Sequence, residues 1–226
     1  MTQTPAANPL SRLSPARLLS YLSDERMAVL LAMARAARQF LCRQRAEGMY
    51  EILDYDSTLE LADPRGELAV FRRRQRVRFL QDNVIAFQDR AWGDGELFAD
   101  YRCSPGVEVD RYQEGDQWTV LISLRETKSA GDVEEFYIER TVRGGFTRDE
   151  EWRQTEIRHT TRHLKLAVVF PGERRCRRAV LVQRSRNRAT ALDHTHFTDL
   201  PDWRQVLTWE TSHPGRFEVY TLKWKW

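Results

Sequence analysis

The stretch Trp118-Thr-Val-Leu-Ile-Ser-Leu124 decides the fold, because its core-type apolar residues occupy every second position. The same period of two returns in Leu164–Phe170 and at the carboxyl end in Tyr220–Trp226. Since successive side chains of a strand point to opposite faces, this alternation predicts strands with one face in a core. Turn signals rich in Gly, Pro and Asp separate the runs. We therefore predict an all-β domain over residues 49–226, an antiparallel, immunoglobulin-like β-sandwich of nine to ten strands.

The residues before this domain have a helical period instead. Ser14-Pro15 is typical of a helix start, and Gly48 is suited to end a helix. We predict a disordered leader over residues 1–14 and a helical appendage over 15–48, made of two α-helices. Five apolar residues of the second helix recur at helical spacing and form a candidate surface for a partner or a second copy. They are Met27, Leu30, Leu31, Ala34 and Leu41.

The amino-acid composition limits the classes of protein to which this chain can belong. Apolar residues make up 41% of the chain and aromatic residues 11%, which is enough for a packed core. The three cysteines lie far apart in the sequence, so they form a poor disulfide framework and suit a reducing compartment. The most apolar stretch, Met27–Leu41, is interrupted by Arg35 and Arg38 and is too short to span a bilayer. We expect a soluble, cytoplasmic protein with no membrane partner.

Arginine outnumbers lysine 32 to 4, although 33 acidic residues reduce the net charge to +3. Arginine binds planar anions through a rigid, bidentate guanidinium, so its clusters mark candidate anion-binding surfaces. A GC-rich genome would produce the same bias without any function. Because positive and negative charges nearly balance over the whole chain, a strongly basic surface could arise only where the arginines cluster.

The first cluster is Arg72-Arg-Arg-Gln-Arg-Val-Arg78. On a strand, Val77 and Phe79 would face the core and alternate arginines would form an outward ridge, with neighbours roughly 6.7 Å apart. The ridge consists of Arg72, Arg74, Arg76 and Arg78. Such a ridge would suit a phosphodiester backbone or another anion.

A structural role is the alternative for this ridge. The short Asp63–Glu67 loop predicts a hairpin, and pairing Ala62 with Leu68 would place Asp56 opposite Arg74 and Asp54 opposite Arg76. Cross-strand ion pairs would then neutralise half of the ridge, each contributing only about 0.2–1 kcal/mol. We favour this structural interpretation of the first cluster.

The second cluster follows the Pro171-Gly172 turn, and Glu173 is the only acid near it in sequence. It contains seven arginines: Arg174, Arg175, Arg177, Arg178, Arg184, Arg186 and Arg188. On loops they would bind a phosphate, a nucleic acid or an acidic protein surface, unless distant acids neutralise them. Trp92, in a Trp-Gly-Asp-Gly turn, is a candidate for stacking on a base if it is exposed.

Catalytic and metal signatures are weak. The chain has no Gly-x-Ser-x-Gly and no Gly-rich phosphate loop. His194 and His196 would share one strand face beside Asp193, but a metal site needs three or four ligands and no further ligand stands at a recognisable spacing. We therefore predict no metal, no cofactor and no catalytic residues.

These observations favour a non-enzymatic recognition or adaptor module, in which the sandwich is the scaffold and the helical segment docks a protein partner or a second copy. A nucleic-acid-binding protein that uses the two arginine clusters is the first alternative. A metal-dependent hydrolase that uses Asp193, His194 and His196 is the second.

Overall fold

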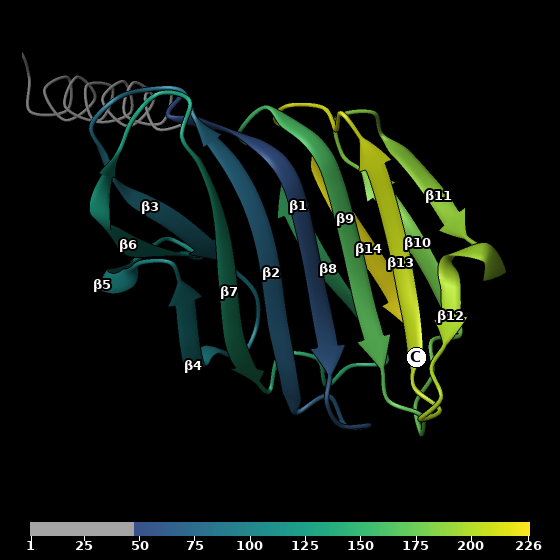
Figure 1. The fold of residues 1–226 in the computed structure, drawn as a ribbon. Coiled ribbons are helices and arrows are strands. Elements are labelled where there is room, and N and C mark those ends of the chain that lie inside the picture. Colours follow the sequence, from purple (N-terminus) through teal and green to yellow (C-terminus); the bar gives the residue numbers. More distant parts are fainter. Residues whose placement is uncertain (1–47) are drawn as a thin grey trace, which may run out of the picture. The chain divides into compact units, whose positions relative to one another are not determined.

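The computed structural model describes residues 48–226, so the predicted leader, the two helices and the five apolar residues proposed for partner docking lie outside it. The described residues are all β, as predicted, and their one helical element is a 3-10 turn at His194–His196. Their strands form three sheets of seven, four and three strands (Figure 1). No helix among them is long and apolar enough to cross a membrane.

The seven-stranded sheet is the frame of the domain, with the order β12-β13-β9-β1-β2-β7-β4. Its strands are β1 (Tyr50–Leu61), β2 (Leu68–Phe79), β4 (Glu96–Ser104), β7 (Val133–Arg143), β9 (Thr161–Phe170), β12 (Phe197–Asp199) and β13 (Gln205–Ser212). The β1–β2 hairpin is fixed by Asp63, whose carboxylate accepts hydrogen bonds from the backbone N–H groups of Arg65 and Leu68. Gly66 in this turn has a φ of 71°, and a Cβ there would collide with the carbonyl of Phe146.

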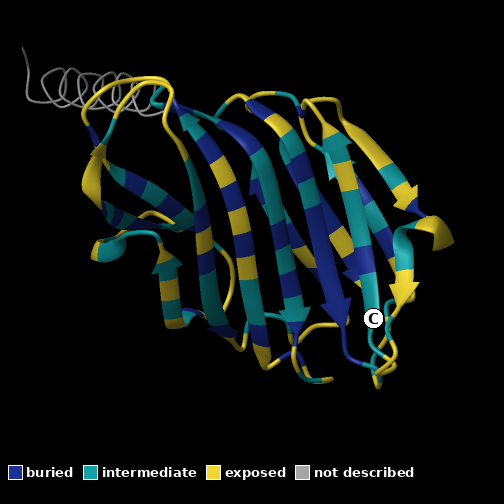
Figure 2. Cartoon of the chain, in the orientation of Figure 1, coloured by how far each residue is buried: buried dark blue, intermediate teal, exposed yellow. Residues whose placement is uncertain are grey.

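The four-stranded sheet packs behind the frame, and the main core lies between the two (Figures 1 and 2). Its order is β11-β10-β14-β8, with β8 (Glu150–Glu156), β10 (Arg178–Gln183), β11 (Arg188–Leu192) and β14 (Val219–Lys225). The carboxyl-terminal strand is central in this sheet, which confirms the prediction that the end of the chain is paired into a sheet. Leu222, Trp224 and Trp226 are fully buried in the core.

The three-stranded sheet covers the other half of the frame, with the order β3-β6-β5. It contains β3 (Val84–Ala91), β5 (Val107–Glu114) and β6 (Gln117–Lys128). A second core forms here from Phe87, Val120 and Ile122 against β1, β2 and β7. The Phe87 ring stacks on Phe136 with a centroid distance of 4.1 Å.

The predicted sandwich needs three corrections. The described residues contain fourteen strands rather than nine or ten, and three sheets rather than the two of an immunoglobulin domain. The frame is also not purely antiparallel, because β1 and β9 pair in parallel. Two of the extra strands are short, β11 and β12, and β5 exposes most of its side chains, so these three give little alternating signal.

Candidate anion-binding site

The first arginine cluster lies on β2, and its ridge is on the solvent face of the frame, as predicted. The register confirms that Asp54 lies opposite Arg76 and Asp56 opposite Arg74. Acids on both neighbouring strands contact the ridge, so its charge is largely compensated. The ion pairs are Arg72–Glu60 at 2.5 Å, Arg72–Glu139 at 2.7 Å, Arg74–Glu135 at 3.3 Å, Arg76–Asp54 at 3.8 Å and Arg78–Glu51 at 2.9 Å.

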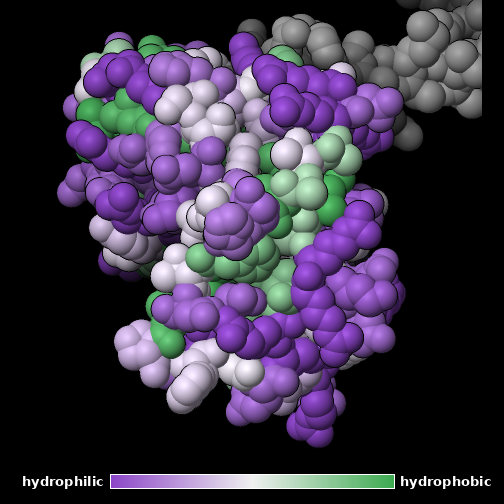
Figure 3. Space-filling model, turned by 90° about the vertical axis from the view of Figure 1, so that its right-hand side faces the viewer, coloured by the Kyte–Doolittle hydropathy of each residue, from purple (hydrophilic) through white to green (hydrophobic). Residues whose placement is uncertain are grey.

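The second cluster does not form one loop, because the six residues of β10 separate its two halves by about 20 Å. Arg174 pairs with Asp149 at 2.8 Å and stacks on the Trp226 ring, and Arg175 pairs with Asp199. At the far end, three exposed arginines surround the β10–β11 turn: Arg184, Arg186 and Arg188. Figure 3 views the β11–β12 side of the molecule and shows a mostly hydrophilic surface around a hydrophobic strip. Anion binding by either half stays a prediction.

A different set of arginines lies inside the domain, between the two cores. Arg73 points away from the ridge, and its side chain is 8% exposed. It pairs at 2.9 Å with Asp89 of β3, which is fully buried. Burial lowers the pKa of Arg73, but Asp89 and neighbouring tyrosines outweigh that effect, so the net pKa is raised. This ion pair connects the frame to the three-stranded sheet.

Arg140 of β7 is the second buried cation, and it has no adequate counter-charge. Its side chain is 11% exposed, and its nearest carboxylate oxygen, on Asp89, lies 3.9 Å away. Nε and Nη1 are buried without any hydrogen-bond partner among the described residues. The guanidinium instead stands over the Phe71 ring, 4.1 Å from its centroid. Burial lowers the pKa of Arg140, and Asp89 opposes this only in part.

Arg153 of β8 is the third buried cation, with a side chain 7% exposed. Its guanidinium donates to neutral acceptors only: the carbonyl oxygens of Ser57 at 3.2 Å and Ala167 at 2.8 Å, and Ser57 Oγ at 2.5 Å. It also lies 5.5 Å from the centroid of Phe71. With no carboxylate as a hydrogen-bond partner, burial lowers the pKa of Arg153 to about 10.

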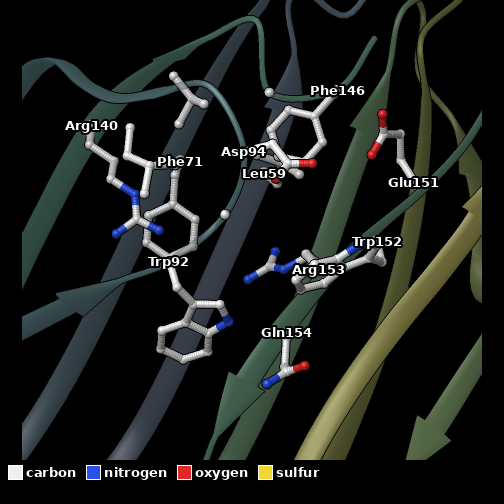
Figure 4. A pocket seen from close by; sticks show the side chains of 14 residues that line it. Leu59, Phe71, Trp92, Asp94, Arg140, Phe146, Glu151, Trp152, Arg153 and Gln154 are labelled. Carbon is white, nitrogen blue, oxygen red and sulfur yellow. The ribbon is translucent and has the colours of Figure 1, made fainter. Parts of the chain in front are cut away.

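Arg140 and Arg153 line one cavity, on either side of Phe71 (Figure 4). The cavity volume is about 70 Å³. The frame contributes side chains of β1, β2, β4 and β7 to its walls, and β8 contributes residues 151–154. The remaining walls are the β3–β4 loop at Trp92–Asp94 and the β7–β8 loop at Gly145 and Phe146. Trp92, expected from the sequence to be an exposed stacking residue, is instead half-buried and forms part of the wall.

The acids that line this cavity do not neutralise its arginines. Asp94 pairs with Arg148 at 3.1 Å, and Glu151 accepts a hydrogen bond from the backbone N–H of the same Arg148. Burial raises the pKa of Glu151. Among the described residues, the carboxylate that forms ion pairs with this set of three arginines is that of Asp89, which contacts Arg73 and Arg140.

The predicted metal candidates form a local cap rather than a site. Asp193 Oδ1 accepts hydrogen bonds from Thr195 N and Oγ1 and lies 3.1 Å from His196 Nδ1. These contacts hold the 3-10 turn together and lower the pKa of Asp193 to about 2. Within residues 48–226, no three His, Cys, Asp or Glu side chains come together as a metal site would require.

The buried arginines have one signal in the sequence that our predictions did not use. In β7, Phe136, Ile138, Arg140 and Val142 occupy alternate positions, so Arg140 stands in a core-facing series. Arg73 stands in the corresponding series of β2, between Phe71 and Val77. An arginine in a core-facing position indicates a buried charge, whereas Arg153 has only polar neighbours in its series and gives no such signal.

Comparisons with known proteins identify no family. No protein-family model matches the chain, and no curated protein matches it. Two solved structures of an M1 zinc metallopeptidase from Deinococcus radiodurans are similar, one of them an E323A mutant bound to a Tyr-Ser-Ala substrate. The identities are 10% and 12%, with TM-scores of 0.49 and 0.43. In both cases the match covers 76% of this chain and 42% of the peptidase.

This comparison overturns the prediction of a non-enzymatic recognition or adaptor module. The similar structures are hydrolases, and they give no support to an adaptor. The prediction is wrong, and we do not retain it. The likeness does not transfer peptidase activity either, because the identity is too low.

Proposed function

We propose that this domain binds a small organic carboxylate in the cavity between Arg140 and Arg153. The observation that carries the proposal is the state of Arg140 on the wall of that cavity. Its Nε and Nη1 are buried without a hydrogen-bond partner among the described residues, and its nearest carboxylate, Asp89, lies 3.9 Å away and already pairs with Arg73 at 2.9 Å. A buried charge whose donors are unsatisfied is strongly unfavourable. A bound anion would remove this penalty, and the binding free energy would include the gain.

Size and shape favour a carboxylate. One water requires roughly 10–15 Å³ of comparable cavity space, so this cavity has room for only a few non-hydrogen atoms. Carboxylates match the planar fork of a guanidinium, and such charge-assisted hydrogen bonds are about twice as strong as neutral ones. Phe71 and Trp92 supply apolar walls for the rest of the ligand. The ligand would thus be a short carboxylate with a small apolar group.

Isothermal titration calorimetry tests the proposal with formate, acetate and propionate, and with propionamide as an uncharged analogue of propionate. We expect the carboxylates to bind and propionamide not to bind. Arg140→Met should weaken carboxylate binding by tenfold to a hundredfold, in line with the roughly 1.5–3 kcal/mol of a hydrogen bond to a charged group.

Arg76→Met is the matched control, because Arg76 is half-exposed on the opposite face of the frame. It removes the same charge from the molecule and should leave carboxylate affinity unchanged. Inorganic phosphate and sulfate form the comparison arm: if they bind at the same site more tightly than any carboxylate, the ligand class is wrong. If no anion binds at millimolar concentration, or if both variants weaken binding equally, the proposal fails.

A further inference from the structure

The wall that β8 contributes to the cavity is its edge rather than one of its faces. Four consecutive residues of β8, from Glu151 to Gln154, line the cavity. Because alternate side chains of a strand point to opposite faces, a surface on one face would be lined by every second residue. β8 is the terminal strand in its sheet, with β14 as its only neighbour among the described strands. The cavity therefore runs along an unpaired strand edge.

The register shows which backbone groups face that edge. The N–H of Trp226 donates to the carbonyl of Asp149, and the N–H of Ile157 donates to the carbonyl of Glu218, at the two ends of the β8–β14 ladder. In an antiparallel pair, hydrogen-bonded positions alternate, so the odd-numbered residues of β8 bond to β14. The N–H and C=O groups of Trp152 and Gln154 consequently point to the open edge, into the cavity wall.

An open edge and an arginine pocket together define a particular ligand. An extended peptide adds to a sheet edge through backbone hydrogen bonds, and its terminal carboxylate is a planar anion. The cavity has space for a terminal residue only, so the preceding residues would lie outside it, along β8.

We infer that the carboxylate of the proposed function is the carboxyl terminus of an extended peptide, which pairs with β8 and places its last residue between Arg140 and Arg153. This inference rests on the proposed carboxylate site and specifies the molecule that carries the carboxylate. It assigns two roles: the guanidiniums bind the terminal charge, and Trp152 and Gln154 bind the peptide backbone through their main-chain groups.

Three synthetic peptides of one sequence test the inference on the unmodified full chain by calorimetry. The first has a free carboxyl terminus, the second a terminal amide, and the third a free carboxylate with N-methyl groups on the residues before the last. We expect the first peptide to bind at least about tenfold more tightly than propionate. Amidation should abolish binding, and N-methylation should reduce affinity to that of propionate.

A pair of variants tests the edge from the protein side. Gln154→Pro removes one outward N–H while leaving the ladder to β14 intact, because proline is tolerated on the open side of an edge strand. Gln154→Ala is its control, since it changes the side chain and keeps the N–H. The proline variant should lose at least about tenfold in peptide affinity and retain its propionate affinity, and the alanine variant should retain both.

The outcomes separate the two proposals. If propionate binds through Arg140 but the peptide binds no better and N-methylation has no effect, the inference is overturned and the carboxylate site stands. If neither ligand binds, both proposals fail. The N-methylated peptide decides between these outcomes even if Gln154→Pro does not fold, because it requires no change in the protein.

Discussion

At the scale of single residues, the three buried arginines differ in how their charge is compensated. Arg73 has Asp89 at 2.9 Å, and Arg153 has three oxygen acceptors, but Arg140 lies 3.9 Å from Asp89, and its Nε and Nη1 have no hydrogen-bond partner among the described residues. Replacing an unsatisfied buried ion with an apolar side chain is often neutral or stabilising. Replacing Arg140 with an apolar residue should therefore stabilise the domain and weaken anion binding.

Arg140→Met and Arg73→Met should accordingly change stability in opposite directions. The first removes a guanidinium with unsatisfied donors and should stabilise the domain by up to about 2 kcal/mol. The second leaves the buried Asp89 without its close ion-pair partner, with Arg140 at 3.9 Å, and should destabilise the domain by about 3–5 kcal/mol. Urea denaturation of the two variants and the parent gives both values. Destabilisation of several kcal/mol by Arg140→Met would show that Arg140 has a partner essential to the fold.

Carboxylate affinity should depend on pH through the protonation of the Arg153 guanidinium. Burial lowers its pKa to about 10, so the free protein loses this charge as pH rises through that value. A bound carboxylate favours the charged form, so affinity should be constant from neutral pH to about pH 9 and should fall above pH 10. Calorimetry across this range measures the effect, with far-ultraviolet circular dichroism as the control for folding. Constant affinity up to pH 11 would contradict a role for Arg153.

At the scale of elements, the strands with one apolar face were predictable, and two of the buried charges, Arg73 and Arg140, stand in core-facing series of their strands. The hairpin register of β1 and β2 follows from a short loop with Asp63, and it placed the arginine ridge opposite its acids. Period two also identified β14, because its aromatic residues all face one side. Asp89 and Arg153 could not be identified, since a polar residue on a strand is expected to face solvent unless its partner strand is known. Sheet order, which joins β1 to β9, is a long-range property that local patterns do not contain.

The carboxyl-terminal strand should tolerate no truncation. Trp226 is 1% exposed, its indole N–H donates to the carbonyl of Arg148 at 2.8 Å, and its ring packs against Phe170. Trp226→Ala should therefore cost about 3–5 kcal/mol, as large-to-small core substitutions do. Trp203→Ala is the matched control, because Trp203 is 82% exposed and should change stability by no more than about 0.5 kcal/mol. Equal midpoints of denaturation for the two variants would contradict the buried role of Trp226.

At the scale of the whole described domain, three long strands pass through both cores. β1 contributes Ile52 to the core under the three-stranded sheet and Leu59 to the core under the four-stranded sheet. β2 and β7 do the same, and Arg73 and Arg140 lie in the middle of these strands, where one core ends and the other begins. Tyr55 and Phe98 pack against both cores. The polar cluster is thus the junction between two apolar regions of one frame.

Because the same strands support both cores, the described domain should unfold in one cooperative transition. Phe87→Ala perturbs only the core under the three-stranded sheet, and Leu222→Ala only the core under the four-stranded sheet. Each should destabilise by about 2–5 kcal/mol, and each should lower the protection of β6 and β14 amides equally in native-state hydrogen exchange. If Phe87→Ala instead lowered protection in β6 alone and left β14 unchanged, the two cores would be separate folding units.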